Sequence, residues 1–413
     1  MGLDLTSFSA ALKQHYTNMT VQNMVYPDNP FFAMVAKMEE FGGRNLPIPL
    51  IYANPQSGSA TFSRAQARST SSATGTKAFL LTRGKEYSVA TIDNETILAT
   101  KGNSNAFMEA ATTEIDGAIY AATRSACQAM YRSGWGTLGQ IGSISTTTIT
   151  LLQVEDVVNF EVGMELDLAA SESSGATRAY GTSTNGLIIT AINRVTGVLT
   201  FGFNVTDVTN GIPTAAANDF IFRRGDRDAA AASILKLVGL EGWIPATAPT
   251  STAFFGVDRT ADVTRLGGLR YDGTSIPIEE ALIDAATLVA REGGKPDTCF
   301  ISYGKYGSLE KSLGSKVQYV NLNVGEIAFR GIQVNGPRGS IQVIPDQNCP
   351  ANRAFMLTMK TWKLYSLGKA IQLFDTDGQQ MLRQSAADGV EVRVTGYLNL
   401  GCSAPGWNCN VQL

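Results

Sequence analysis

Residues 104–133 read SNAFMEAATTEIDGAIYAATRSACQAMYRS, and this stretch decides the fold that we expect. Asn103 and Ser104 suit the start of a helix, and Gly134 suits its end. At about 1.5 Å per residue, such a helix would be roughly 45 Å long. Its apolar residues recur at helical spacing and form one face made mostly of alanine, across which other elements should lie at close range: Phe107, Ala111, Ile115, Ala118, Ile119, Ala122, Ala126, Ala129 and Met130.

Composition places the chain among folded globular proteins. Its 413 residues suffice for two or three domains, and 44% of them are hydrophobic against 17% charged. The net charge of -3 gives no general argument for binding nucleic acid or an anionic membrane. No window holds eighteen consecutive apolar residues, and residues 1–16 lack the basic flank and apolar core of a signal peptide.

Cysteine and histidine usage limits the chemistry that the chain can perform. His15 is the only histidine, which excludes most metal sites and most histidine-based acid–base catalysis. We therefore expect no metal and no cofactor. The five cysteines form no C-x-x-C pair, so reduced thiols are expected, although a disulfide between the last two is left open: Cys127, Cys299, Cys349, Cys402 and Cys409.

Residues 41–100, before the helix, have the pattern of an extended hairpin. An apolar strand at 46–52 contains two prolines at alternate positions, which confine it to a sheet edge. A long polar stretch of small residues at 56–76 forms the tip. Strand patterns return at 79–81 and 85–92. We expect strand, long tip and strand in that order.

The hairpin has no apolar core of its own and is charged with one sign. Residues 1–40, before it, contain no long periodic run, and we expect an extended arm that lies on something else. The tip is either disordered or docked on an acidic neighbour. All charged residues between Glu40 and Glu86 are basic: Arg44, Arg64, Arg68, Lys77, Arg83 and Lys85.

Residues 144–222, after the helix, are rich in threonine, valine, isoleucine and glycine and contain short strand patterns. Strands at 187–192 and 198–203 flank a five-residue turn and predict a hairpin. We expect a small acidic β domain inserted between helical segments. Only Arg178 and Arg194 oppose its acids, which are Glu155, Asp156, Glu161, Glu165, Asp167, Glu172, Asp207 and Asp219.

Beyond Arg223 the pattern predicts an α+β region. Helices are expected at 228–238, 277–291 and 303–313; the second has glutamates in its first turn and is stopped by two glycines. Strands are expected at 298–301, 331–334, 341–344, 354–359, 362–366, 371–374 and 390–398.

Three short motifs suggest chemistry, and each has a better structural explanation. Residues 134–139 match G-x-G-x-x-G but follow a helix and precede β sequence, which is the reverse of a dinucleotide site. Residues 375–378 begin like a calcium loop, but Ala386 stands where a bidentate glutamate is needed. Ser308 and Lys311 have the spacing of a serine–lysine nucleophile without any other matching motif. No catalytic residue is assigned.

In its order of arm, basic hairpin, long helix and α+β region, the chain resembles the major capsid proteins of tailed bacteriophages, which have the Hong Kong 97 fold. The resemblance covers most of the chain outside the acidic β insertion. The resemblance rests on short sequence segments at 255–259 with 265–268, at 278–292 with 294–297, at 314–317, at 329–332, at 381–385 with 388–393, and at 400–407.

The resemblance implies a division of the chain. It is an N-terminal arm (1–40), an extended hairpin called the E-loop (41–100), a spine helix in the peripheral domain (101–143), an inserted β domain (144–224), and the remaining peripheral and axial domains (225–413). It further implies that the chain is a structural subunit of pentamers and hexamers in an icosahedral head around double-stranded DNA, assembled in the host bacterial cytoplasm. The basic hairpin residues are then candidates for contacts between subunits: Arg64, Arg68, Lys77, Arg83 and Lys85.

Two departures from the minimal fold matter. The β insertion is additional, so its placement on the outer surface or between subunits stays open. The segment before the hairpin is too short for a fused scaffolding region, which implies a separate scaffolding protein or assembly without one. The resemblance also implies a portal protein as a partner, and it leaves a decoration protein open. Contact with DNA should be electrostatic and without base readout.

Two other functions are considered. An encapsulin-type compartment shell would have the same fold, although an insertion of this size is rare there. An enzyme with a β-rich accessory domain belongs to a different class, and the single histidine and lack of a convergent motif argue against it. Complementary charge between the basic hairpin and the acidic insertion of another copy is a further hypothesis.

Overall fold

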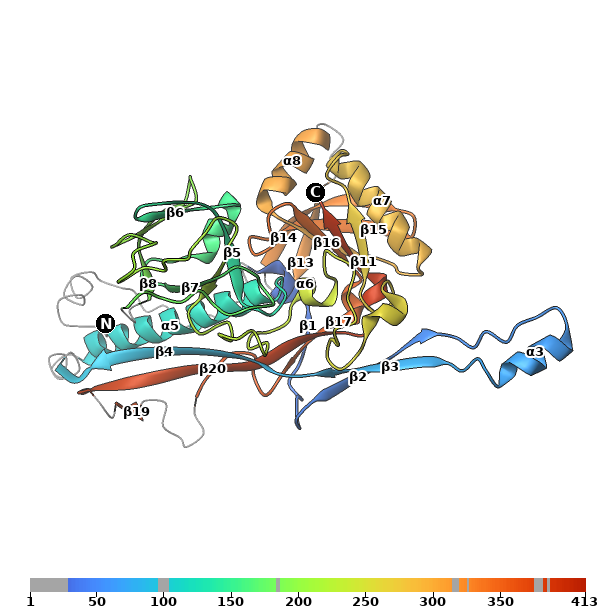
Figure 1. Cartoon of the computed structure of the whole chain (residues 1–413), viewed down its shortest axis with the longest axis horizontal. Helices are drawn as coiled ribbons and strands as arrows, with labels where there is room; N and C mark the ends of the chain where they lie inside the picture. The colour runs from blue at the N-terminus through green and yellow to red at the C-terminus, as the bar shows by residue number, and fades with distance from the viewer. Residues whose placement is uncertain are drawn as a thin grey trace.

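The structure is a computed structural model that describes residues 29–95, 104–182, 186–313, 319–324, 327–374, 382–384 and 387–413. Figure 1 shows an elongated molecule in which a thin hairpin projects far beyond one end. A small barrel and a larger sheet with two helices stand side by side along a pair of long strands. The arrangement combines helices and sheets, as the α+β pattern predicts.

The expected hairpin is present. Strands β2 (Leu46–Ala53) and β3 (Gly75–Leu81) form a two-stranded antiparallel sheet, in which Pro47 lies opposite Leu80 and Pro49 opposite Ala78. The proline-bearing strand is therefore an edge strand, as predicted. The tip contains a helix that we did not predict, α3 (Phe62–Ser69), none of whose residues is buried.

The long helix is α5 (Ser104–Ala129), 26 residues or about 39 Å in length. It ends before Ser133, the expected end, because the amides of Tyr131 and Arg132 bond carbonyls three residues back and tighten the chain into a turn. The alanine face behaves as expected, since Ala118 and Ala122 pack directly on the strand pair beneath the helix.

That strand pair consists of β4 (Gly84–Asp93) and β20 (Gly389–Cys402). The two strands run antiparallel over ten residue pairs, with Ala90 of β4 and Val394 of β20 buried against α5. The other edge of β20 carries three strands, and a further strand pairs in parallel with the first of them: β17 (Trp362–Ser366), β18 (Gln372–Leu373), β19 (Leu382–Arg383) and β1 (Ala36–Met38).

The β-rich insertion is a closed barrel of six strands. It begins at Thr137, before the expected start at residue 144, because Gly134 and Gly136 adopt left-handed φ values of 96° and 83° and turn the chain out of the helix directly into the first strand. The expected hairpin is the pair β8–β9. The elements are β5 (Thr137–Ser145), β6 (Thr148–Leu151), η1 (Val154–Asn159), β7 (Glu165–Ala169), β8 (Leu187–Asn193), β9 (Val198–Phe201) and β10 (Phe220–Arg223).

The C-terminal region builds a seven-stranded sheet, flanked by the two longer helices of this region (Figure 1). The helices α7 (Ile278–Arg291) and α8 (Tyr303–Leu313) confirm two of the three predicted helices. In spatial order the strands are β11 (Leu269–Asp272), β21 (Cys409–Gln412), β16 (Arg353–Leu357), β12 (Thr298–Ile301), β15 (Gly339–Pro345), β14 (Ile327–Gly336) and β13 (Tyr319–Val324).

The helix predicted at 228–238 is wrong. The Asp228 carboxylate accepts hydrogen bonds from the amides of Ala232 and Ser233 at 2.9 and 3.0 Å, and Ala231 has a left-handed φ of 52°. An aspartate that satisfies nearby amides in this way competes with helix formation. The segment is an irregular connection instead.

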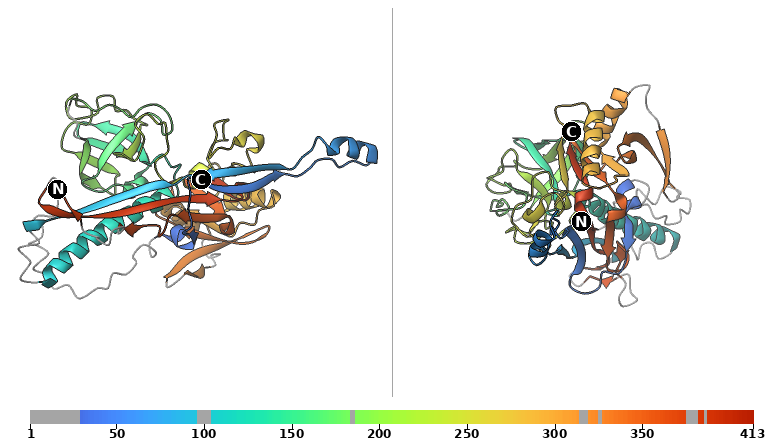
Figure 2. Two further views of the ribbon diagram at one scale, coloured as in Figure 1. Left: turned by 90° about the horizontal axis from the view of Figure 1, so that it is seen from below. Right: turned by 90° about the vertical axis from the view of Figure 1, so that its right-hand side faces the viewer.

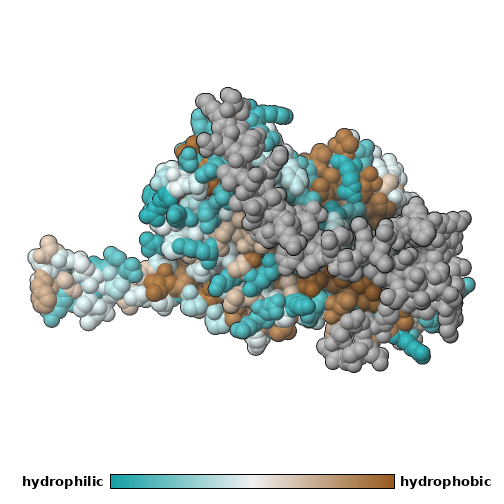
Figure 3. Space-filling model, turned by 180° about the vertical axis from the view of Figure 1, so that it is seen from behind, coloured by the Kyte–Doolittle hydropathy of each residue, from teal (hydrophilic) through white to brown (hydrophobic). Residues whose placement is uncertain are grey.

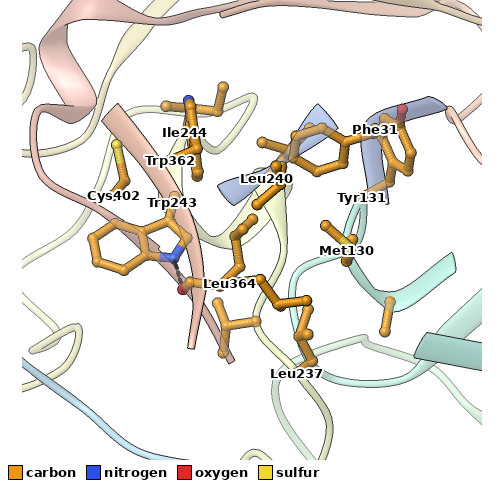
Figure 4. Packing of buried hydrophobic residues seen from close by; sticks show 14 of the residues in the cluster. Phe31, Met130, Tyr131, Leu237, Leu240, Trp243, Ile244, Trp362, Leu364 and Cys402 are labelled. Carbon is orange, nitrogen blue, oxygen red and sulfur yellow. Dashed lines mark hydrogen bonds between the residues drawn. The ribbon is translucent and has the colours of Figure 1, made fainter. Parts of the chain in front are cut away.

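The main hydrophobic core joins the arm, the hairpin root, the end of α5, β17 and β20. Its centre is Trp243 at the end of the short helix α6 (Leu240–Trp243), whose indole N–H donates to the Leu400 carbonyl at 2.8 Å (Figure 4). Trp243 also packs edge-on against Trp362, with 6.5 Å between ring centroids. The described residues also contain four short helical turns: α2 (Pro30–Met34), η2 (Arg259–Asp262), η4 (Met359–Thr361) and η5 (Pro405–Trp407).

All five cysteines are free thiols and all are buried, so Cys402 and Cys409 form no disulfide. Burial raises the pKa of the Cys402 thiol to about 12. Because the thiolate is the reactive form, the thiols are chemically quiet.

A buried carboxylate anchors the N-terminal arm to the rest of the chain. Asp346 is fully buried, and its Oδ2 accepts the Tyr131 hydroxyl at 2.7 Å and the Phe31 amide at 3.4 Å. The Asn348 amide donates to Oδ1 at 2.9 Å, and the Asn348 side chain donates to Asn29 at 2.6 Å. Burial raises the pKa of Asp346, while these donors oppose the shift.

We predict that Asp346→Asn lowers the free energy of unfolding by about 2–3 kcal/mol, because an amide places a donor where the chain already presents donors. The measurement is urea denaturation of the purified chain. Asp388→Asn, an exposed aspartate that accepts from Asn94, is the control and should change stability by less than about 0.5 kcal/mol. Equal losses in the two variants would contradict the anchoring role.

Candidate assembly surfaces

The basic residues that the sequence predicts to contact other copies lie along the hairpin and at its root. Arg64 and Arg68 are on α3, Lys77 is on β3 and Lys85 is on β4, and all four side chains are exposed. The structure brings only the two arginines of α3 together on one short element. These four cations are accessible to another molecule.

Arg83, the fifth candidate, is used within its own chain. Its Nη1 donates to the carbonyls of Phe41 and Gly43 at 2.9 and 2.8 Å, and its guanidinium lies 5.3 Å from the centroid of the Phe41 ring. It therefore ties the root of the hairpin to the segment that precedes β2.

The hairpin tip is apolar as well as basic. Phe62, the first residue of α3, is 80% exposed, and Figure 3 shows apolar colouring at the far end of the hairpin. A helix of eight residues is not stable by itself in water, and within the described part of the chain no residue of this helix is buried. The tip therefore presents both apolar and basic side chains at its surface.

A cavity of about 370 Å³ lies at the hairpin root, between β2 and the turn at 403–407. Ile51 and Trp407 line it, and Arg265 closes one side by donating to the Tyr52 carbonyl at 2.7 Å. Glu292 is the only acid in its lining. Ser403 also lines the cavity, but its hydroxyl donates to the Thr361 carbonyl at 3.3 Å and has no base beside it in the lining that the structure describes.

The acids of the barrel are largely engaged within the chain. Glu172 accepts the hydroxyls of Ser133 and Thr137 at 2.6 and 2.7 Å. Asp219 forms a two-bond pair with Arg178, and Tyr180 donates to Asp167 at 2.5 Å. Three further acids are in ion pairs: Asp156 with Arg132, Glu161 with Arg124 and Arg194, and Glu165 with Arg224. Most of the acidic excess therefore stabilises the barrel and its joints.

Two arginines, Arg124 of α5 and Arg132 just after it, attach the barrel to the body. Arg132 donates to Asp156 of η1 at 2.8 Å, and both side chains are nearly buried. Arg124 pairs with Glu161 at 2.5 Å and donates to the Val158 carbonyl. Behind Arg132, burial raises the pKa of Glu241, and Arg132 and Arg353 oppose the shift. The joint is polar rather than apolar.

Among the residues that the structure describes, the short motifs form no catalytic or metal site. The Ser308 hydroxyl donates to the Gly304 carbonyl at 3.1 Å, four residues back in α8, which is an ordinary helical contact. No group of three or more metal-ligating side chains gathers among the residues that the structure describes. His15 and the loop at 375–378 lie outside the described residues.

No helix in the described part of the chain has the length and hydropathy needed to span a membrane.

Sequence reasoning missed the exposed apolar residues of the hairpin and of β4. Phe62 is a single apolar residue in a polar tip, and Tyr87 and Val89, which are 54% and 53% exposed on β4, alternate with buried residues as in any strand. Alternation predicts which residues share a face but not which face is covered. Only the structure shows that the face opposite α5 is open.

Comparison with known proteins connects this geometry to a family. A family model described as SU10 major capsid protein matches residues 203–391. Among solved structures, the chain is similar to the cyanophage A-1(L) capsid asymmetric unit, with 11% sequence identity, a TM-score of 0.53 and 97% of each chain covered. That similarity shows that the two chains share a fold.

Other similarities are weaker. The capsid of the native GTA particle matches at 7% identity with a TM-score of 0.46, covering 99% of this chain and 98% of that chain. The holo-SrpI encapsulin of Synechococcus elongatus PCC 7942 matches at 9% identity and a TM-score of 0.27, covering 35% of this chain and 52% of that chain. This partial match gives no support to a compartment shell. The comparison with curated proteins finds no match.

We predict that Arg132→Met destabilises the chain by about 3 kcal/mol, because it leaves the Asp156 carboxylate buried without its cation. Thermal or urea unfolding of the purified chain measures this. The same substitution at Arg291, whose pair with Glu292 is largely exposed, is the control and should cost less than about 0.5 kcal/mol. A loss at Arg132 no larger than at Arg291 would show that the joint does not depend on this pair.

Proposed function

We propose that this chain is a major capsid protein of a tailed phage. The match of the SU10 major capsid protein model to residues 203–391 and the fold shared with the cyanophage capsid chain support this proposal. It is a structural subunit of the virion that associates with copies of itself into an icosahedral capsid. In the proposed assembly it forms pentamers and hexamers around double-stranded DNA, and the shell is built in the host cytoplasm.

The observation that carries the proposal is the hairpin. It extends away from the body of its own subunit (Figure 1), and its tip helix combines an exposed phenylalanine with two exposed arginines and buries nothing. A shell made of identical copies repeats every contact by symmetry, so a projecting element that buries nothing in its own subunit can contact the next copy. The tip is therefore proposed to rest on a neighbouring copy.

The parts of the chain follow from this role. Residues before β2 serve as the arm, β2 to β3 as the hairpin, and α5 with the β4–β20 pair as the peripheral domain. The seven-stranded sheet serves as the axial domain. The barrel is a decoration of the minimal fold, and Figure 2 shows it as a separate rounded unit next to the β4–β20 pair. No catalytic activity is proposed for any part.

Further partners belong to the same proposal. A separate scaffolding protein, a portal and a decoration protein would meet the shell, and DNA would be held by charge without base readout. The negative net charge of the subunit keeps that contact weak.

The basic hairpin is proposed to work through Arg64 and Arg68. Arg83 is already bound to its own chain, and most acids of the barrel have partners. Because most acids of the barrel are paired within their own chain, few of them are available to bind the hairpin of another copy. The two arginines are therefore expected to bind exposed acids or carbonyls of a neighbouring copy. Such rim charges act mainly on association rate and salt dependence.

The function predicts that the full chain, expressed alone or with a scaffolding protein, forms closed shells or capsomer rings. Light scattering and negative-stain electron microscopy measure the size and shape of the product. A chain that stays a monomer or dimer in both conditions would overturn the proposal.

We further predict that Arg64→Glu with Arg68→Glu lowers the association constant about tenfold or more at low salt, corresponding to on the order of 1–2 kcal/mol per contact. Particle yield against salt concentration is the measurement. Arg64→Lys with Arg68→Lys keeps the charge and is the matched control. Unchanged yield and unchanged salt dependence in the glutamate variant would remove these arginines from the interface.

A further inference from the structure

Strand β4 has an open edge. The Lys85 amide points away from β20, because it donates to the Leu235 carbonyl at 3.1 Å, whereas the Asn94 amide points the opposite way and donates to Asp388 at 3.1 Å. Backbone direction alternates along a strand, so the amides and carbonyls of Tyr87, Val89, Thr91 and Asp93 also point outward. Within the described residues, no strand pairs with this edge.

The open edge is long and unprotected. From Tyr87 to Asp93 it runs about 20 Å. Edge strands that must remain single usually carry a proline, an outward lysine or a bulge. The residues from Tyr87 to Thr91 contain none of these, and the pairing of β4 with β20 shows no register shift.

The two edges of the hairpin differ in their ability to pair with another strand. Leu80 of β3 donates its amide outward to the Phe255 carbonyl at 2.9 Å, so Thr76 and Ala78 also direct their amides outward. On β2, Pro47 lies opposite Leu80 and Pro49 lies opposite Ala78, at positions where an amide would point out of the ribbon. The β2 edge is therefore closed to pairing, and the β3 edge is open beyond Leu80.

The two open edges cannot meet within one chain. β3 ends at Leu81 and β4 begins at Gly84, and the two strands follow each other in nearly the same direction in Figure 1. Antiparallel pairing between them would need a turn that two residues in an extended line do not provide. Only another copy can bring a β3 edge against a β4 edge.

We propose that the open edge of β3 in one copy pairs with the open edge of β4 in a second copy. The result is a continuous four-stranded arrangement in which β2 and β3 of one copy are followed by β4 and β20 of the second copy. This proposal rests on the proposed function, because it needs copies of the chain assembled side by side. At one end of β4, the Lys85 amide is already bonded to the Leu235 carbonyl, so the partner strand must stop before Lys85. On the outer side of the new sheet, Pro47 and Pro49 of β2 offer no amide to a further strand.

The side chains agree with this pairing. Tyr87 and Val89 are half exposed and present apolar surface beside the edge, and the exposed Phe62 lies further out on the same hairpin that would cross it. Residues from Tyr87 to Thr91 carry no charge, so Lys77 of β3 meets no like charge there. Main-chain bonds would supply affinity, and the apolar side chains would supply fit.

Amide hydrogen exchange tests the pairing in the assembled particle. Peptides covering 76–78 and 87–91 should exchange on the order of a hundredfold more slowly in particles than in unassembled subunits. Particles in which these amides exchange as fast as in free subunits would overturn the pairing while leaving the capsid role intact. A chain that forms no particles would overturn both.

Proline variants separate hydrogen bonding from simple burial. Val89→Pro and Ala78→Pro each remove one outward amide, and each should lower particle yield by about tenfold or more. Val89→Thr and Ala78→Thr keep the amide and a strand-compatible side chain, and should assemble normally. Thermal unfolding of each unassembled variant verifies that it is folded. If folded proline variants at either position assemble like wild type, the proposed pairing is wrong.

Discussion

The antiparallel ladder between β4 and β20 is the constraint on which the rest of the structure depends. It joins residues roughly 300 positions apart in the chain, and it carries α5 on one face. Everything between, including the barrel and most of the seven-stranded sheet, is enclosed in the loop that this ladder closes. Closing so long a loop costs conformational entropy, so local units are expected to form before the ladder. Because the face of α5 is made of small alanine side chains, the helix packs closely on β4 and β20 and stabilises the ladder between them.

Much of the fold could be predicted because the spacing of apolar residues along the sequence indicates its helices and strands. The helix α5, the strands of the hairpin, the β8–β9 pair and helices α7 and α8 all follow from spacing and from turn residues. The helix predicted at 228–238 failed for a local reason that propensity ignores, since Asp228 satisfies the amides of its own turn. The helix α3 was missed because a short helix without a buried face leaves no periodic signal. The basic residues of the hairpin were visible in sequence, but the binding of Arg83 to its own chain, the engaged acids of the barrel and the open edge of β4 depend on tertiary placement.

The barrel differs from the body in how it is attached. Its own core is a separate cluster around residues such as Phe160 and Leu199, distinct from the cluster around Trp243. Between the two, the contacts are arginine pairs and hydrogen bonds, among them Asn352 to Gln153 at 3.4 Å. Interfaces of this polar kind between domains of one chain resemble those of transient complexes. The barrel can therefore gain its stability alone, while its orientation depends on a few charged side chains.

One further consequence follows from the closure of the barrel. Its first and last strands, β5 and β10, are hydrogen-bonded neighbours, and Gly136 at the entrance lies against Asp226 at the exit. The chain thus leaves the body and returns to it at nearly the same place, and a closed barrel leaves no unpaired strand behind. In evolutionary terms, a gene could acquire or lose the barrel in one recombination event. A short linker would then bridge the gap, and the topology of the rest of the subunit would not change.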